Sequence, residues 1–158
     1  MSSQKKVLFV CLGNICRSPI AEAVFNHIVE QRKLSDKWLA DSCAIGTWHV
    51  GRTPDRRAIT VLKNHGINKY EHKARQLCDD DFVRFDYIFG MDDENMRDIE
   101  ELSPQRVTAV VDRLGNYHPD GPTIIKDPYY DRNMDGFESV YDKCVKCINA
   151  FLDKIEKQ

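Results

Sequence analysis

The chain has 158 residues, of which 42% are hydrophobic and 30% are charged, and its formal net charge is −2 at pH 7. This length and balance predict one globular domain over residues 1–158, large enough to bury a core. The net charge excludes the broad basic surface that is typical of nucleic-acid binding, so any anion site must be local.

The first expected element is a buried strand over Val7–Cys11, followed by a short loop and a helix that starts after Ser18. Ser18 suits the N-cap of that helix, and Pro19 suits its first helical position. The apolar run Val7–Leu12 is far too short to span a membrane, and no signal peptide is expected at the N-terminus. Apolar residues recur at helical spacing after the loop, namely at Ile20, Ala21, Val24, Phe25 and Ile28.

Strands and helices alternate along the rest of the chain, without a linker or an internal repeat. After the first strand, further strands are expected over residues 39–45, 87–91 and 107–111, with a short extended piece over 73–77. Further helices are expected over residues 54–65, after residue 92 and over 136–154. This alternation predicts an α/β fold with three layers, in which a parallel sheet carries helices on both faces. Ligands of such sheets bind beyond the carboxyl ends of the strands, where Cys11 and Asp92 are expected.

The loop after the first strand combines groups that hold a phosphate against a sulfur nucleophile. Backbone N–H groups of a tight loop and a helix N-terminus favour an anion, and the planar fork of Arg17 can bind two phosphate oxygens. The same positive field favours a thiolate, so Cys11 is the candidate nucleophile. The alternative is a strand-to-helix turn with a buried free cysteine. The expected phosphate-binding residues are Leu12, Gly13, Asn14, Ile15, Cys16, Arg17 and Ser18.

The chain contains a second cysteine–arginine pair with the same spacing, Cys78 and Arg84. Three aspartates, 79–81, stand between them and would repel both a thiolate and a phosphate. This segment is therefore interpreted as a solvated acidic turn that leads into a short helix.

Six cysteines in a chain of this size, without a secretion signal, favour free thiols in a reducing compartment, so we expect a cytoplasmic protein. Cys144 and Cys147 form a C-x-x-C pair that raises zinc or redox chemistry. No second pair of suitable spacing exists, and both residues fit the apolar face of the last helix, so core packing is the favoured interpretation.

The segment Cys11-Leu12-Gly13-Asn14-Ile15-Cys16-Arg17-Ser18-Pro19 resembles the signature of the low-molecular-weight protein tyrosine phosphatases. The resemblance implies a sheet of four strands in the order 2-1-3-4. It also implies hydrolysis of phosphotyrosine in proteins and of aryl phosphates, with acid phosphatase activity, through a cysteinyl-phosphate intermediate. We expect no metal or other cofactor, because the thiolate and Arg17 already perform the tasks that a metal would. The likeness extends over essentially the whole chain, including Asp41-Ser42, His72–Gln76, Phe85–Ile88, Met91-Asp92 and Asp127–Tyr130.

A leaving phenolate departs slowly unless an acid protonates its oxygen. Asp127, followed by Pro128, Tyr129 and Tyr130, is the candidate, although the pattern alone also fits a surface turn with exposed tyrosines. The resemblance assigns Asp127 as the general acid.

Besides capping the helix, Ser18, as the residue after Arg17, can donate a hydrogen bond to the Cys11 thiolate and assist its departure. The resemblance also implies that a polar network of Ser18, Ser42 and His72 holds Asn14. Asn14 is a residue type that tolerates left-handed backbone, whereas His72 alone would be taken for a surface histidine. Cys16 is either a small packing residue or a trap that captures an oxidised Cys11 as a disulfide, and the resemblance favours the trap.

An aromatic slot at the mouth of the site would suit a flat phenyl ring. The related phosphoarginine phosphatases typically carry Thr where this chain has Ile15, so Ile15 favours phosphotyrosine. We expect tyrosine-phosphorylated proteins as substrates, and phosphate or vanadate as inhibitors. By the resemblance, the pocket residues are Leu12, Ile15, Trp48, His49, Tyr129 and Tyr130.

Two other functions share parts of this pattern. An arsenate reductase of the same fold would pass oxidation along further cysteines, but Cys78 stands alone until Cys144. A phosphate-binding module without turnover would not need Cys11, Arg17 and Asp127 together.

Overall fold

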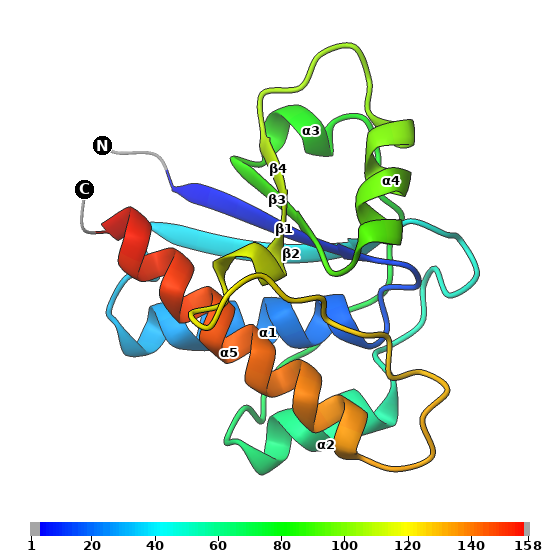
Figure 1. Cartoon of the computed structure of the whole chain (residues 1–158), viewed down its shortest axis with the longest axis vertical. Helices are drawn as coiled ribbons and strands as arrows, with labels where there is room; N and C mark the ends of the chain where they lie inside the picture. Colours follow the sequence, from blue (N-terminus) through cyan, green and yellow to red (C-terminus); the bar gives the residue numbers. More distant parts are fainter. Residues whose placement is uncertain (1–3, 157–158) are drawn as a thin grey trace.

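The computed structural model describes residues 4–156, and residues 1–3 and 157–158 of the expected domain lie outside the described part. Four parallel strands form one sheet in the order β2-β1-β3-β4, which confirms the predicted topology (Figure 1). The strands are β1 (Lys5–Cys11), β2 (Trp38–Ala44), β3 (Tyr87–Gly90) and β4 (Val110–Arg113). The helices are α1 (Arg17–Gln31), α2 (Arg56–Asn64), α3 (Asp81–Arg84), α4 (Asp93–Leu102), the 3-10 helix η1 (Leu114–Tyr117) and α5 (Asp135–Glu156).

Strand β1 lies inside the sheet, and both of its faces are buried. Val7 and Phe9 join the larger core, to which α1, α2 and α5 contribute, while Leu8 and Val10 join a smaller core that includes Phe82 of α3. Figure 1 shows α1, α2 and α5 on one side of the sheet and α3 and α4 on the other. The predicted helices on both faces are thereby confirmed, and β1 is rigidly held where it delivers Cys11.

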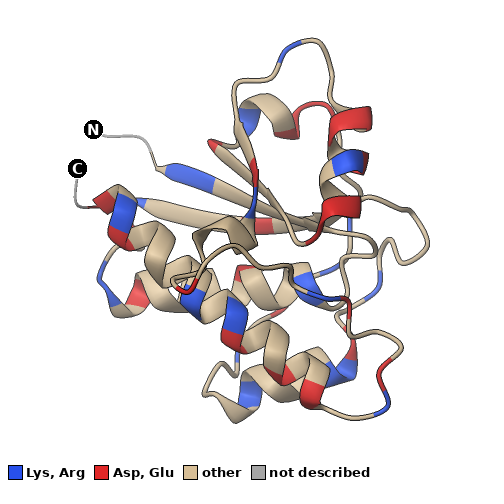
Figure 2. Ribbon diagram, in the orientation of Figure 1, with Lys and Arg blue, Asp and Glu red and all other residues tan. Residues whose placement is uncertain are grey.

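Acidic positions dominate α4, where Arg97 stands among five Asp and Glu residues, whereas both signs are interspersed along α5 (Figure 2). Within residues 4–156, none of the helices combines the length and the apolar character that crossing a membrane requires.

Helix α1 begins earlier than expected, at Arg17, and its N-cap is Cys16, which makes no side-chain cap hydrogen bond. Ser18 is therefore not the N-cap, and the expectation that Pro19 stands at the first helical position is also wrong. Pro19 is still in the first turn, where its missing N–H group leaves no intrahelical bond unmade. The early start places Arg17 in the first turn, beside the anion-favouring end of the helix.

Strand β4 starts later than expected, at Val110, because the residues before it hydrogen-bond to α3 and not to β3. The N–H groups of Thr108 and Ala109 donate to the carbonyl of Phe82, at 3.0 and 3.1 Å, and so they meet α3 before the strand begins. Val110 is the first residue that pairs with β3, opposite Tyr87. Helix α2 ends as the sequence predicts, since Gly66 follows it with a φ of +86°.

Candidate active site

Cys11 is the last residue of β1, and the loop that follows returns the chain into α1 within five residues. Asn14 has a left-handed backbone with a φ of 58°, which turns its own N–H group inward to donate to Cys11 Sγ at 3.3 Å. The hydroxyl of Ser18 lies 3.0 Å from the same sulfur. Two hydrogen-bonding groups thus face Cys11 Sγ at the start of a helix.

The side chain of Asn14 is fully buried and makes four hydrogen bonds. Its Nδ2 donates to Ser18 Oγ at 2.8 Å and to Ser42 Oγ at 3.0 Å. Its Oδ1 lies 2.7 Å from His72 Nε2 and accepts from the backbone N–H of Arg75 at 3.2 Å. The structure therefore brings Asn14, Ser18, Ser42 and His72 into one contiguous network, and Arg75 is a member that the sequence analysis missed.

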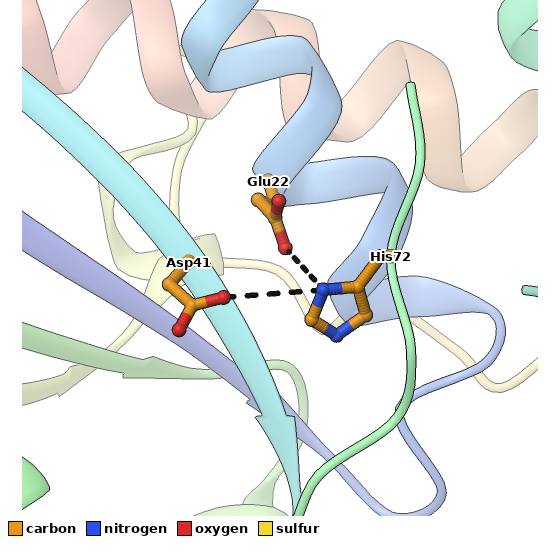
Figure 3. Close-up of side chains that lie close together, drawn as sticks. All are labelled: Glu22, Asp41 and His72. Carbon is orange, nitrogen blue, oxygen red and sulfur yellow. Dashed lines mark ion pairs between the residues drawn. The ribbon is translucent and has the colours of Figure 1, made fainter. Parts of the chain in front are cut away.

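His72 lies between two carboxylates, Glu22 of α1 and Asp41 of β2 (Figure 3). Its Nδ1 is 3.4 Å from Glu22 Oε1 and 3.9 Å from Asp41 Oδ1. Burial raises the pKa of Glu22 to about 7 and lowers the pKa of His72, so burial favours the neutral form of each. The same Oε1 accepts from Ser42 Oγ at 2.6 Å and from Tyr70 OH at 3.0 Å, and these bonds fix the carboxylate that orients the imidazole.

Among the residues that the structure describes, Glu22, Asp41 and His72 form the group that could hold a metal ion, since one ligand atom from each lies within 4.8 Å of the others. Glu22 Oε1 already accepts from Ser42 and Tyr70, Asp41 Oδ2 accepts from the Arg75 guanidinium, and His72 Nε2 contacts Asn14 Oδ1. We therefore interpret the cluster as support for His72.

The guanidinium of Arg17 is almost fully buried beside the Cys11 loop. Its Nη1 donates to Asp92 Oδ2 at 2.5 Å and to the carbonyl of Ile125 at 3.0 Å, while its Nη2 lies 3.7 Å from Asp127 Oδ2. Burial opposes the charge of Arg17, but Cys11 and Asp92 outweigh it and raise its pKa. A permanent cation is thus held next to the sulfur, where a phosphate would be bound.

A cavity of about 370 Å³ opens above Cys11. Asp127 stands at its wall with 36% of its side chain exposed, and its Oδ1 accepts from the N–H of Tyr129 at 3.1 Å. The cavity therefore brings the sulfur, the guanidinium and a carboxyl group within reach of one ligand. Its lining residues are Cys11, Leu12, Gly13, Ile15, Cys16, Arg17, Trp48, His49, Asp127, Tyr129 and Tyr130.

All six residues expected around the pocket mouth line this cavity. The rings of Tyr129 and Tyr130 meet edge to face, 4.9 Å apart, and Tyr130 is 89% exposed. His49 packs over Gly13, where an added Cβ would lie 2.8 Å from the imidazole ring. The Nδ1 atom of His49 is buried without a hydrogen-bond partner. A side chain at position 13 would therefore displace the His49 ring, which is a polar wall residue of the cavity.

The second cysteine–arginine pair does not form a comparable loop. Cys78 is exposed, and the short helix α3 follows it as expected. The interpretation of the whole segment as solvated is wrong for Asp81, which is fully buried because it binds Arg75. Cys144 and Cys147 are buried in the larger core, which confirms their predicted packing role.

The roles of two further residues at the site were not predicted from the sequence. Asp92, which the sequence placed at the carboxyl rim, is the N-cap of α4 and binds Arg17. Arg57, in the first turn of α2, donates to the carbonyls of Tyr129 and Asp131, both at 2.9 Å, and so anchors the loop of Asp127. No local pattern indicates a contact across 72 residues.

Comparison with known proteins agrees with this geometry. Residues 6–158 match the model of the family described as low molecular weight phosphotyrosine protein phosphatase. The low molecular weight phosphotyrosine protein phosphatase of Sus scrofa is 52% identical over 153 residues, which cover 96% of each chain. 

Two solved structures extend the comparison. A protein tyrosine phosphatase from Entamoeba histolytica superimposes with a TM-score of 0.91 at 33% identity, covering 98% of each chain. The Drosophila arginine phosphatase DARP superimposes with a TM-score of 0.88 at 39% identity, covering 94% of this chain and 96% of the other. The match of family, fold and loop together shows that the chain belongs to the low molecular weight phosphotyrosine protein phosphatase family.

Proposed function

We propose that this protein hydrolyses phosphotyrosine in proteins, and aryl phosphates more generally, through a cysteinyl-phosphate intermediate. The observation that carries the proposal is the convergence of Cys11, Arg17 and Asp127 on one cavity of about 370 Å³. A nucleophile, a charge clamp and a proton donor are the three groups that this reaction needs.

The reaction proceeds in two displacements at phosphorus. The Cys11 thiolate attacks the phosphorus atom and forms the S–P bond, while the P–O bond to the phenol breaks and Asp127 gives its proton to the leaving oxygen. Asp127, now a carboxylate, takes a proton from a water molecule that attacks the phosphocysteine. The S–P bond then breaks and releases inorganic phosphate and the thiolate.

The loop stabilises charge through both steps. Its N–H groups and Arg17 face the phosphoryl oxygens, on which negative charge is spread in the transition state. The Ser18 hydroxyl, 3.0 Å from Cys11 Sγ, assists departure of the thiolate in the second step. Asn14 and its network keep the N–H groups of the loop aimed inward.

The walls of the cavity favour an aromatic substrate. Tyr129, Tyr130 and Trp48 offer flat faces and edges to a phenyl ring. Because one structural relative is an arginine phosphatase, phosphoarginine is the second candidate substrate. Ile15 at the mouth, in place of the Thr expected in phosphoarginine phosphatases, favours phosphotyrosine.

Inorganic phosphate and vanadate would compete for the same loop. The free thiols fit a reducing, cytoplasmic compartment, in which peroxide would inactivate the enzyme reversibly through a Cys11–Cys16 disulfide. Residues 1–158 would act as one catalytic domain without a cofactor, and with acid phosphatase activity.

The test is to measure turnover of matched peptides that carry phosphotyrosine, phosphoserine or phosphoarginine, together with p-nitrophenyl phosphate. We expect hydrolysis of the phosphotyrosine peptide and of p-nitrophenyl phosphate, with phosphate and vanadate as competitive inhibitors. Preferential hydrolysis of the phosphoarginine peptide would reassign the substrate, and no turnover of any of them would contradict the proposed activity.

A further inference from the structure

The guanidinium of Arg75 forms a bidentate pair, here called the fork, with the carboxylate of Asp81, which has no contact with solvent. Its Nη1 donates to Asp81 Oδ2 at 3.0 Å, and its Nη2 donates to Asp81 Oδ1 at 3.1 Å, so two parallel hydrogen bonds join the pair. Asp81 has 0% exposure, and its Oδ2 also accepts from the N–H of Cys78 at 2.9 Å. Asp41, which is partly exposed, accepts from Nε and Nη2 of Arg75 on the other side, at 3.2 and 3.0 Å.

A buried carboxylate is tolerated in a protein only when it is paired and hydrogen-bonded. Asp81 satisfies this condition through Arg75, and burial of Arg75 is in turn outweighed by Asp81 and the other nearby groups, which raise the pKa of the guanidinium. The pair is held firmly, since the buried Asp81 carboxylate would lose its charged partner if Arg75 moved away. It sits at the start of α3, a helix of only four residues.

The backbone of Arg75 reaches the phosphate loop. Its N–H donates to Asn14 Oδ1 at 3.2 Å, and its carbonyl accepts from the N–H of Ala44, at the end of β2, at 2.7 Å. The second contact to Asn14 Oδ1 comes from His72, three residues earlier. Residues 71–75 belong to no helix or strand. Backbone hydrogen bonds join Ala74 to Gly51 and Arg52, and Gln76 forms an isolated bridge with Ala44. The Arg75 side chain adds a second anchor to this segment, on the side of Asp41 and Asp81.

We propose that Asp81, acting through Arg75, is a positioning residue for the phosphate loop. It lies outside the cavity and touches no reacting atom. Its fork with Arg75 holds residues 72–75 so that the His72 imidazole and the Arg75 N–H both meet Asn14 Oδ1. Those contacts lock the left-handed backbone of Asn14, and with it the N–H group that faces Cys11. The inference rests on the proposed function only for its kinetic consequences.

The test variant is Asp81→Asn, which keeps the size of the side chain but places an NH₂ group where two oxygens now accept. At least one bond of the fork is lost, and residues 72–75 loosen. We expect the Ki of inorganic phosphate and the KM of p-nitrophenyl phosphate to rise about tenfold, with a smaller fall in kcat. In ¹⁵N-correlated NMR spectra, the Asn14 side-chain NH₂ signals should shift and exchange faster with solvent.

The matched control is Phe82→Leu, at the next residue. Phe82 is fully buried in the smaller core, so this variant loosens the packing of α3 without touching the fork. We expect it to lower the unfolding temperature while KM, the Ki of phosphate and the Asn14 signals stay as in the wild type. Arg75→Lys keeps the charge but cannot form the fork, and it should reproduce the changes of Asp81→Asn if that variant does not fold.

The outcomes separate this inference from the proposed activity. An inactive wild type would defeat the proposed function, while the Asn14 signals and phosphate affinity would still report on Asp81. The inference is overturned if Asp81→Asn and Arg75→Lys fold but leave the phosphate Ki and the Asn14 signals unchanged. It is also overturned if Phe82→Leu, at equal loss of stability, changes them as much.

Discussion

The guanidinium of Arg17 is bound at one nitrogen by Asp92, with 2.5 Å between Nη1 and Oδ2. The other oxygen of Asp92 accepts from the N–H of Asn95 at 2.7 Å and caps α4. One carboxylate therefore joins the arginine of the phosphate loop to the helix on the opposite face of the sheet. With Nη1 held in this way, Nη2 lies 3.7 Å from Asp127 Oδ2, and the guanidinium lines the cavity where a phosphate would bind.

Replacing Asp92 by Asn should separate these two roles, because Asn also caps helices well. We expect the KM and the Ki of phosphate to rise about tenfold, since Arg17 loses a charged partner that orients it. Unfolding temperature should change little. Asp92→Ala should show the same kinetic loss and, in addition, a destabilisation of about 1 kcal/mol from the missing cap. Steady-state kinetics and thermal unfolding check both variants, and unaltered phosphate binding in Asp92→Asn would refute the orienting role.

Replacing Asp127 by Asn should slow hydrolysis in proportion to how much the leaving group needs a proton. The contribution of a general acid is about 10²–10⁴-fold. The loss should be largest for phenols of high pKa and small for p-nitrophenol, which leaves readily without protonation. A series of aryl phosphates measures this dependence. Equal losses across the series would assign the acid role to another group.

Ionised Asp55 caps α2, and its protonation should make α2 less stable in acid. Burial alone would raise the pKa of Asp55, but hydrogen bonds from Arg57 outweigh burial and lower it. The contribution to stability is then present above the unfolded pKa, near 4, and is lost as pH falls through the folded pKa. Asp55→Ala should therefore cost about 1 kcal/mol at neutral pH, where the N-cap bond to the N–H of Arg57 is made, and less at low pH. Urea unfolding from pH 3 to pH 7 measures the difference, and a constant cost across that range would contradict it.

Mild peroxide should inactivate the wild type reversibly through Cys11 and Cys16. Burial raises the pKa of Cys16, so this thiol should not be the first to be oxidised. We expect a sulfenic acid on Cys11, capture by Cys16, protection by bound phosphate, and recovery with dithiothreitol. Cys16→Ser should recover much less, and Cys78→Ser should behave as the wild type. Peptide mass mapping without a Cys11–Cys16 crosslink, together with equal recovery in all three proteins, would leave Cys16 as a packing residue.

The sequence predicted the strands and helices whose apolar residues recur at a regular spacing. Alternating strands and amphipathic helices predicted the parallel sheet, and the order 2-1-3-4 followed from the family resemblance carried by the Cys11 loop. The start of β4 was misplaced because Thr108 and Ala109 hydrogen-bond to Phe82, a tertiary contact that no periodicity contains.

The errors at the site have the same origin. Of the two roles expected of Ser18, the contact with Cys11 is confirmed, whereas the helix cap is wrong because Ser18 lies inside the helix. Asp81 belongs to a run of three aspartates, which predicts a solvated turn. Its burial depends on Arg75, which lies on a separate, irregular segment of the chain. Long-range charge pairs of this kind leave no periodic trace in a sequence.

The central claim is that phosphate is transferred to Cys11, and trapping the intermediate tests it most directly. Each protein is mixed rapidly with p-nitrophenyl phosphate, quenched in acid, digested and mapped by mass spectrometry, with Cys78→Ser as the matched control for Cys11→Ser. The account predicts a phosphoryl group on the peptide that contains Cys11 in the wild type and in Cys78→Ser, and neither label nor turnover in Cys11→Ser. A phosphoryl group on another residue, or continued turnover by Cys11→Ser, would contradict it.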